Sequence, residues 1–196
     1  MLVSKYLPSS TVGVLVFGHL LFAASSMAQE DGSEVYSAFA SQTTTVNRTS
    51  RLQFTIDRWT TDVQRARLIG AIAERGQAAM AEELQKQDPT GTMRIIGGTG
   101  AGGRTQFTLR YAREFVNGDQ RQLVLATDRY ITFGDARRNT TTEDNNLSFI
   151  VLELDREQKG EGQMMIGVKM NFVDGKLEVE SYAREPIKLL TVKREK

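Results

Sequence analysis

Residues 105–133, TQFTLRYAREFVNGDQRQLVLATDRYITF, predict the β-hairpin around which the fold is organised. The first arm, residues 105–113, alternates apolar and polar side chains, which is typical of a strand with one apolar face. Asn117-Gly118 then supplies the strongest short-range signal for a tight hairpin turn. The second arm, residues 120–128, carries four consecutive apolar residues and is expected to be covered on both faces. This hairpin indicates an antiparallel sheet.

Further strands are predicted on both sides of this hairpin. Alternation predicts one strand at residues 51–56 and another at 163–172, where Met164, Ile166, Val168, Met170 and Phe172 would face inward. The nearly apolar segment 147–154 is expected in the middle of the sheet. A tight turn at residues 173–175 predicts a second hairpin. The last strand, residues 187–192, follows Pro186 and is expected at an edge.

Two short helices are predicted between the first strands. Thr61 and Gln64 fit a capping box at the first helix start, and Gly76 is a plausible left-handed helix stop. A second helix, residues 77–87, would end before Pro89. The fold class expected is therefore α+β: a curled antiparallel sheet of about seven to eight strands, with an N-terminal helical hairpin packed on one face.

The first 28 residues match a signal peptide. Lys5 is the sole charge before Glu30, an apolar run occupies residues 12–24, and Ser26-Met27-Ala28 fits a cleavage site. This run is shorter than the roughly 20 residues of a spanning helix, although an uncleaved anchor is the competing interpretation. We expect export to the periplasm or medium, a flexible lead-in at residues 29–50, and a single domain at residues 51–196.

The composition of the remaining chain restricts its chemistry. Without Lys5, 24 of the 25 basic residues remain against 24 acidic ones, so there is no electrostatic footprint for nucleic acid. The single histidine, His19, lies in the predicted leader, and the chain contains no cysteine. Imidazole or thiolate metal sites and His or Cys catalysis are thereby excluded. We expect no cofactor, no metal and no stable membrane span after cleavage, and an enzyme is the less favoured possibility.

A glycine-rich loop imitates phosphate-binding motifs. Gly98, Gly100 and Gly103 satisfy G-x-G-x-x-G, and Arg104 stands where a P-loop has lysine. Both motifs bind phosphate when the loop opens a helix, whereas residues 105–113 predict a strand. A connection between neighbouring strands is the preferred interpretation.

Seven residues are candidates for a ligand site or its rim: Trp59, Arg110, Tyr111, Asp128, Arg129, Met164 and Met170. Asp128 could join Asp135, Glu143 or Asp144 as a carboxylate pair for glycoside chemistry. The arginines of the hairpin could instead hold an anion, but cross-strand ion pairs, packing of Trp59 and filling of the core by the methionines are the plainer interpretations.

Three stretches, RLQFTIDRWTTDVQRARL, LQKQDPTGTMR and QLVLATDRYI, resemble a group of exported bacterial proteins with no assigned activity. The resemblance implies an exported bacterial domain and no mechanism. The first hypothesis is a non-catalytic binding domain for an apolar small molecule or a protein partner. The alternatives are a carboxylate-based hydrolase and a structural envelope protein that recruits a partner along residues 187–192 by strand addition.

The leader prediction is tested by the mass of the exported protein. Cleavage after Ala28 should leave a chain that begins at Gln29, which intact-mass measurement and N-terminal sequencing would detect. A full-length chain recovered from the membrane fraction would instead identify an uncleaved anchor.

Overall fold

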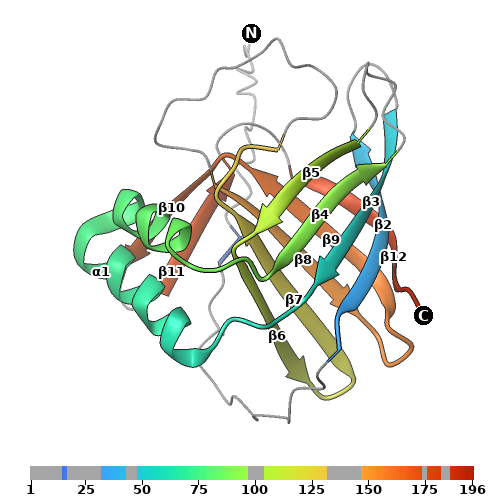
Figure 1. Cartoon of the computed structure of the whole chain (residues 1–196), viewed down its shortest axis with the longest axis horizontal. Coiled ribbons are helices and arrows are strands. Elements are labelled where there is room, and N and C mark those ends of the chain that lie inside the picture. The colour runs from blue at the N-terminus through green and yellow to red at the C-terminus, as the bar shows by residue number, and fades with distance from the viewer. Residues whose placement is uncertain are drawn as a thin grey trace, which may run out of the picture.

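Nine strands form one antiparallel sheet that curls into a nearly closed barrel in the computed structural model (Figure 1). The structure describes residues 15–16, 32–42, 48–96, 104–131, 147–173, 176–181 and 186–196. The strand order is β5-β4-β3-β2-β12-β9-β8-β7-β6. These strands are β2 (Glu34–Gln42), β3 (Arg48–Ile56), β4 (Gly91–Ile96), β5 (Arg104–Leu109), β6 (Tyr111–Asn117), β7 (Gln120–Thr127), β8 (Ser148–Leu154), β9 (Lys159–Ile166) and β12 (Ile187–Arg194).

The two edges of this sheet are consecutive in the chain. β5 pairs with β4 and β6 pairs with β7, while Arg110 alone separates β5 from β6. The Arg110 N–H donates to the Ala126 carbonyl (2.9 Å). On the other side of β6, the Thr60 N–H donates to the Ala112 carbonyl (2.7 Å) and the Ala112 N–H donates to Thr60 Oγ1 (3.0 Å). A single bent strand therefore closes the barrel.

Apolar side chains fill the barrel interior. Alternate residues of each strand face inward, such as Leu52, Phe54 and Ile56 of β3, all of them at most 1% exposed. Two inward positions of β9 are Gly160 and Gly162, where an added Cβ would lie 1.8 Å from the Glu153 carbonyl oxygen and 2.5 Å from that of Val151. The absence of a side chain there lets β8 and β9 approach closely, which favours a tightly coiled sheet.

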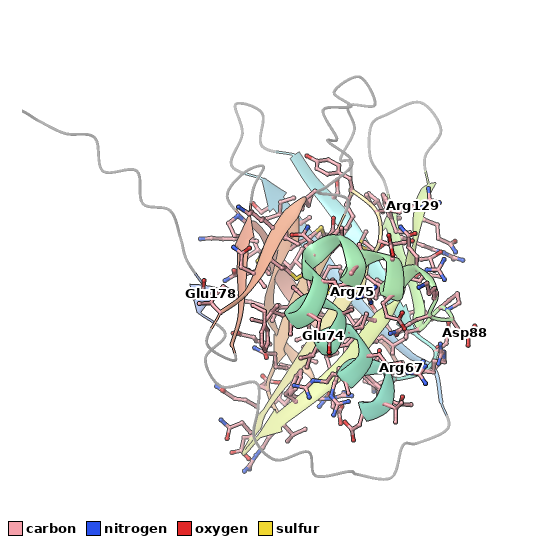
Figure 2. The ribbon with its side chains drawn as sticks, turned by 90° about the vertical axis from the view of Figure 1, so that its left-hand side faces the viewer. Arg67, Glu74, Arg75, Asp88, Arg129 and Glu178 are labelled. Carbon is pink, nitrogen blue, oxygen red and sulfur yellow. The ribbon has the colours of Figure 1, made fainter. Side chains whose placement is uncertain are left out.

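Helix α1 (Asp62–Gln85) covers one outer side of the barrel. Its predicted capping box is confirmed, because Thr61 Oγ1 accepts from the Gln64 N–H (3.2 Å) and Gln64 Oε1 accepts from the Thr61 N–H (2.9 Å). The helix is interrupted at Gly76 (φ 80°, ψ −175°), where the predicted stop separates two helical segments. Figure 2 shows Arg67, Glu74 and Arg75 on the outer surface of α1.

A small three-stranded sheet stands beside the helix (Figure 1). Its order is β1 (Leu15–Val16), β11 (Lys176–Ser181), β10 (Val168–Val173). A second core cluster joins α1 to this sheet and to the outer faces of β8 and β9, through residues such as Ile72, Met80, Val151, Met165 and Met170. Within the described residues, no helix has the length and hydrophobicity needed to cross a bilayer.

Several predictions for the sheet are confirmed. The turn at Gly118 (φ 61°) joins β6 and β7, which pair from Asn117↔Gln120 onward. β8 lies between β7 and β9, as expected for segment 147–154. β10 and β11 pair from Val173↔Lys176, so the second hairpin is present, although its two turn residues lie outside the described residues. The antiparallel sheet with a helical cover is thus confirmed, but the main sheet has nine strands rather than seven or eight.

The last strand is not at an edge. β12 lies between β2 and β9 and pairs with both, so the prediction of an edge strand at residues 187–192 is wrong. Its partner β2 lies within residues 29–50, the expected lead-in, and Tyr36 of β2 is fully buried. The pattern concealed this strand because its outward face carries the apolar Val35 and Phe39, so the inward Tyr36, Ala38 and Ala40 do not stand out as an alternating series.

The predicted strand at residues 163–172 is two strands. Gly167 adopts a left-handed backbone (φ 62°) between β9 and β10. Met164 consequently belongs to the barrel interior, whereas Val168 and Met170 pack under α1. The alternation continues across the break, so the sequence pattern gave no sign of it.

A bulge interrupts β12 at Thr191. The register with β2 shifts between Leu190 and Lys193, and Thr191 has φ 54°. A β-branched residue rarely adopts this backbone. The bulge changes the spacing of inward side chains, because Leu189 and Val192 are both buried in the barrel although three positions apart.

Two glycines of α1 give a matched test of the interruption. Gly76→Ala should lower the free energy of unfolding by about 1–3 kcal/mol, because that backbone region is essentially restricted to glycine. Gly70→Ala, within the regular helix, should raise it by about 0.5–1 kcal/mol. Apart from the adjacent residues and the nearby backbone of the same helix, neither added methyl group would come within 4 Å of another atom, so the contrast reports backbone conformation. Equal effects in urea denaturation would contradict the assignment.

Candidate functional site

The seven candidate residues predicted from the sequence do not form one site. Met164 lies in the barrel interior and Met170 in the second core cluster. Tyr111 packs against that second cluster, and Arg129 is exposed at the end of β7, where Figure 2 labels it. The structure brings together Arg110 and Asp128, with 3.8 Å between Arg110 Nε and Asp128 Oδ2. Trp59 lies apart from all of these, against Arg121.

Arg110 and Asp128 brace the bent strand. Arg110 Nη1 donates to the Gln87 carbonyl (2.7 Å), just beyond the end of α1, and Asp128 is largely buried beside it. This is the ion pair expected of a cross-strand charge. Asp135, Glu143 and Asp144, the acids proposed as partners of Asp128, lie outside the described residues. Across the described ranges, no group of three His, Cys, Asp or Glu residues is placed to hold a metal ion.

A cleft opens where α1 is interrupted, and we call it the kink cleft. Its volume is about 460 Å³, and it is open to solvent on one side. The lining comprises Ile72, Ala73, Gly76 and Gln77 of α1 and Lys169, Met170, Asn171, Phe172 and Val173 of β10. Such a volume is within the range of small-molecule sites, roughly 300–1,000 Å³.

The side chain of Gln77 fixes one end of the kink cleft. Its Nε2 donates to the Val168 carbonyl (2.9 Å), and its Oε1 accepts from the Met170 N–H (2.6 Å). The amide group thereby hydrogen-bonds one backbone carbonyl and one backbone N–H at the outer edge of β10, as a neighbouring strand would. The interruption at Gly76 places Gln77 at the start of the second helical segment, where this contact is made.

The floor of the kink cleft is apolar. Ile72 is 4% exposed and Met170 is 2% exposed, while Phe172 is half-buried and Val173 is exposed at the far end. The polar lining residues are two amides and one lysine, with no carboxylate, hydroxyl or imidazole group among them. This lining can bind hydrocarbon and orient a polar end, but it contains no nucleophile paired with a general base.

A cluster of polar and charged side chains closes one end of the barrel, apart from the kink cleft. We call it the barrel-end cluster, and its members are Glu34, Tyr36, Trp59, Glu114, Arg121 and Gln158. Arg121 is at its centre, with a side chain 13% exposed. Its inward direction follows from β7, where Leu123 and Leu125 face the interior on alternate positions.

The guanidinium group of Arg121 is saturated by protein partners. Its Nε donates to Glu114 (2.7 Å), Nη2 donates to Glu34 (2.9 Å), and Nη1 donates to the Tyr36 hydroxyl oxygen and to Gln158 Oε1, both at 2.6 Å. Nη2 also contacts Glu114. The Trp59 ring lies 5.7 Å from the guanidinium carbon, a cation–π distance. Because these contacts use all the donors, the cluster stabilises the barrel end and leaves Arg121 no donor for an anionic ligand.

Burial and charge shift the ionisation of this cluster. Burial raises the pKa of Tyr36 well above its ordinary value of 10.0, and its hydrogen bond to Glu34 raises it further. Burial alone would lower the pKa of Arg121, but Tyr36, Glu34 and Glu114 together raise it above its usual range. The phenol therefore stays neutral and the guanidinium stays charged at ordinary pH.

The kink cleft and the barrel-end cluster both contain residues that the sequence reasoning missed. Glu34 is one of them, and it begins an alternating series whose later members, Tyr36 and Ala38, are buried. The position of Glu34 in this alternating series was the sequence signal that its charge faces inward. Arg121 is instead one of the hairpin arginines for which a cross-strand ion pair was the preferred interpretation, and its contact with Glu114 is such a pair. The contact of Gln77 with β10 joins segments 91 residues apart, and no local pattern encodes it.

Comparison of the chain with known protein families, curated proteins and solved structures found no match.

Removal of the Tyr36 hydroxyl should change stability in two ways. Tyr36→Phe should lower the free energy of unfolding at pH 7 by about 1–3 kcal/mol, because Arg121 and Glu34 each lose a buried partner. In the original chain, stability should fall as pH rises above 10, since the unfolded phenol ionises there and the buried one does not. Tyr36→Phe should reduce that fall.

Urea denaturation at intervals between pH 8 and pH 11 would measure both effects. Tyr130→Phe, outside the barrel-end cluster, is the matched control and should retain the alkaline fall. An alkaline profile of Tyr36→Phe that coincides with that of the original chain would contradict the assignment.

Proposed function

We propose that the protein is an exported, non-catalytic binding domain that takes an apolar small molecule into the kink cleft. The observation that carries this proposal is the lining of the cleft, an apolar floor flanked by amides, with neither a carboxylate nor a hydroxyl group. Hydrocarbon removed from water there contributes about 25 cal/mol per Å² of buried apolar area.

The site differs from the one that the curled sheet alone suggests. Large apolar side chains occupy the barrel interior, so a ligand is accommodated between the barrel's helical cover and its small sheet. The ligand would contact Ile72 and Ala73 on one side and Phe172 on the other. Export remains part of the proposal through the leader-like first 28 residues and the resemblance to exported bacterial proteins.

The hydrolase alternative has less support. Asp128 is committed to Arg110, and neither residue lines the kink cleft. The envelope-protein alternative required an unpaired edge at residues 187–192 for strand addition. β12 is paired on both sides, so this strand cannot accept a partner in that way.

A pair of tryptophan substitutions tests the proposed site. Ala73 lines the kink cleft, whereas Ala78, on the other side of Gly76, is equally an exposed alanine of α1 but does not line it. Ala73→Trp should fill the cleft and weaken binding of the dye 1-anilinonaphthalene-8-sulfonate by at least about tenfold, or 1.4 kcal/mol. Ala78→Trp should leave it unchanged.

Fluorescence titration measures the dye affinity, and displacement by saturated fatty acids of increasing chain length then tests the preference for hydrocarbon. Circular dichroism verifies that both variants fold. Equal dye binding by the two variants, or displacement that does not depend on chain length, would refute the kink cleft as an apolar site.

A further inference from the structure

A row of outward side chains crosses the middle of the main sheet, and we call it the transverse row. In order from β4 to β8, its members are Ile96, Arg51, Phe39, Leu190, Glu161 and Glu153. Each neighbouring pair is in direct register except Leu190 and Glu161, which lie side by side at the bulge of β12. The residues before and after each member along its strand face the barrel or belong to the bulge, so the row lies on the outer surface.

The centre of the transverse row is an exposed apolar pair. Phe39 is 42% exposed and Leu190 is 38% exposed, and the two are direct partners across β2 and β12. Figure 1 shows these strands on the side of the barrel opposite α1, so the helix does not cover them. In the described ranges, the other exposed large apolar residues are on separate elements: Val63, Val116 and Val173. Single exposed apolar residues are ordinary, so the adjacent pair distinguishes this face.

The charges on the two sides of this pair are opposite in sign. Arg51 lies next to Phe39, whereas Glu161 and Glu153 lie beyond Leu190, and all three charged residues are exposed. Arg51 Nη2 is 3.5 Å from Glu195 Oε1, yet its side chain stays 49% exposed. Like charges directly opposite each other on neighbouring strands are destabilising, so a cation from outside would stabilise Glu153 and Glu161.

The order cation, apolar, apolar, anion is complementary to its own reverse. A two-fold axis between β2 and β12, parallel to these strands, would bring two copies of the row together in opposite directions. Phe39 of each copy would then face Leu190 of the other, and Arg51 of each copy would face Glu161 of the other. Such an interface is isologous, with an apolar centre flanked by opposite charges.

We propose that the protein forms a homodimer through the transverse row, with its two-fold axis between β2 and β12. The outer face of a barrel is convex, which limits the contact area. We therefore expect a weak dimer, with a dissociation constant between about 1 μM and 1 mM. This inference does not depend on the proposed function of the kink cleft, because no residue of the transverse row lines that cleft.

The surrounding charges favour a second copy over other occupants. Glu153 and Glu161 would repel an anionic lipid surface, and a partner of one charge sign would match only half of the row. The axis would also bring Lys188 and Lys193 toward their counterparts. Lys193 Nζ is 3.5 Å from Glu195 Oε1, which compensates its charge, and Lys188 is an exposed, flexible side chain that can turn to solvent.

Sedimentation velocity of the purified full chain over a range of concentrations measures the dimerisation constant. Phe39→Ser should weaken dimerisation by about tenfold or more, because the apolar centre is lost. Val116→Ser is the matched control. Val116 lies on β6, outside the transverse row, and is 61% exposed, so its replacement should leave dimerisation unchanged. A chain that stays monomeric up to about 1 mM, or equal effects of the two substitutions, would overturn the proposal.

An exchange of charges tests which residues face each other. Glu161→Arg and Arg51→Glu should each weaken dimerisation by about tenfold or more, because like charges would then meet. The double variant should restore the dissociation constant to within about threefold of the original. Within one chain the two residues are three strand spacings, or about 14 Å, apart, so restoration reports contact between copies. Circular dichroism verifies folding, and a double variant without restored dimerisation would overturn the arrangement.

Discussion

The closure of the sheet by one bent strand is the constraint on which the rest of the structure depends. A nine-stranded antiparallel sheet has two edges whose backbone groups need partners. Here the edges are successive parts of one segment, and Arg110 turns the chain from the first edge to the second. Thr60 adds to the closure by pairing with Ala112. Once the sheet has closed, every inward side chain shares one interior, and its outer faces become the support for α1.

Closure explains why the polar chemistry is concentrated where it is. An interior filled with hydrocarbon ends at the last layer of inward residues, and there Arg121 meets Glu34, Glu114 and Tyr36. A single charge in that layer would be costly, whereas a saturated one is tolerated. With the interior filled and one end sealed in this way, the cleft that we propose as the ligand site lies outside the barrel, at the break in α1. The stable part of the molecule and the proposed binding part are therefore different layers.

Local chemistry determined what the sequence could predict. The capping box at Thr61, the helix break at Gly76 and the turn at Gly118 depend on neighbouring residues, and all three are confirmed. The position of β12 depends instead on pairing with β2, near the other end of the chain, which no window of sequence contains. Gly167 separates β9 from β10 without disturbing the alternation around it. The candidate site was dispersed for a similar reason, since Met164 and Met170 look alike in the pattern but lie in different cores.

The bulge at Thr191 has a consequence for the length of the last strand. Before the bulge, odd-numbered residues such as Leu189 face the interior, and after it the even-numbered Val192 does. Thr191 is therefore the extra residue of the bulge, and it shifts the inward positions from odd-numbered to even-numbered residues. It does so in a backbone conformation that threonine rarely adopts. A chain shortened by one residue at this point would keep both Leu189 and Val192 inward. Loss of Leu190 would do the same, whereas a deletion before Leu189 or after Val192 would turn one half of the strand inside out, so tolerance of a deletion in this strand is confined to the two residues between Leu189 and Val192.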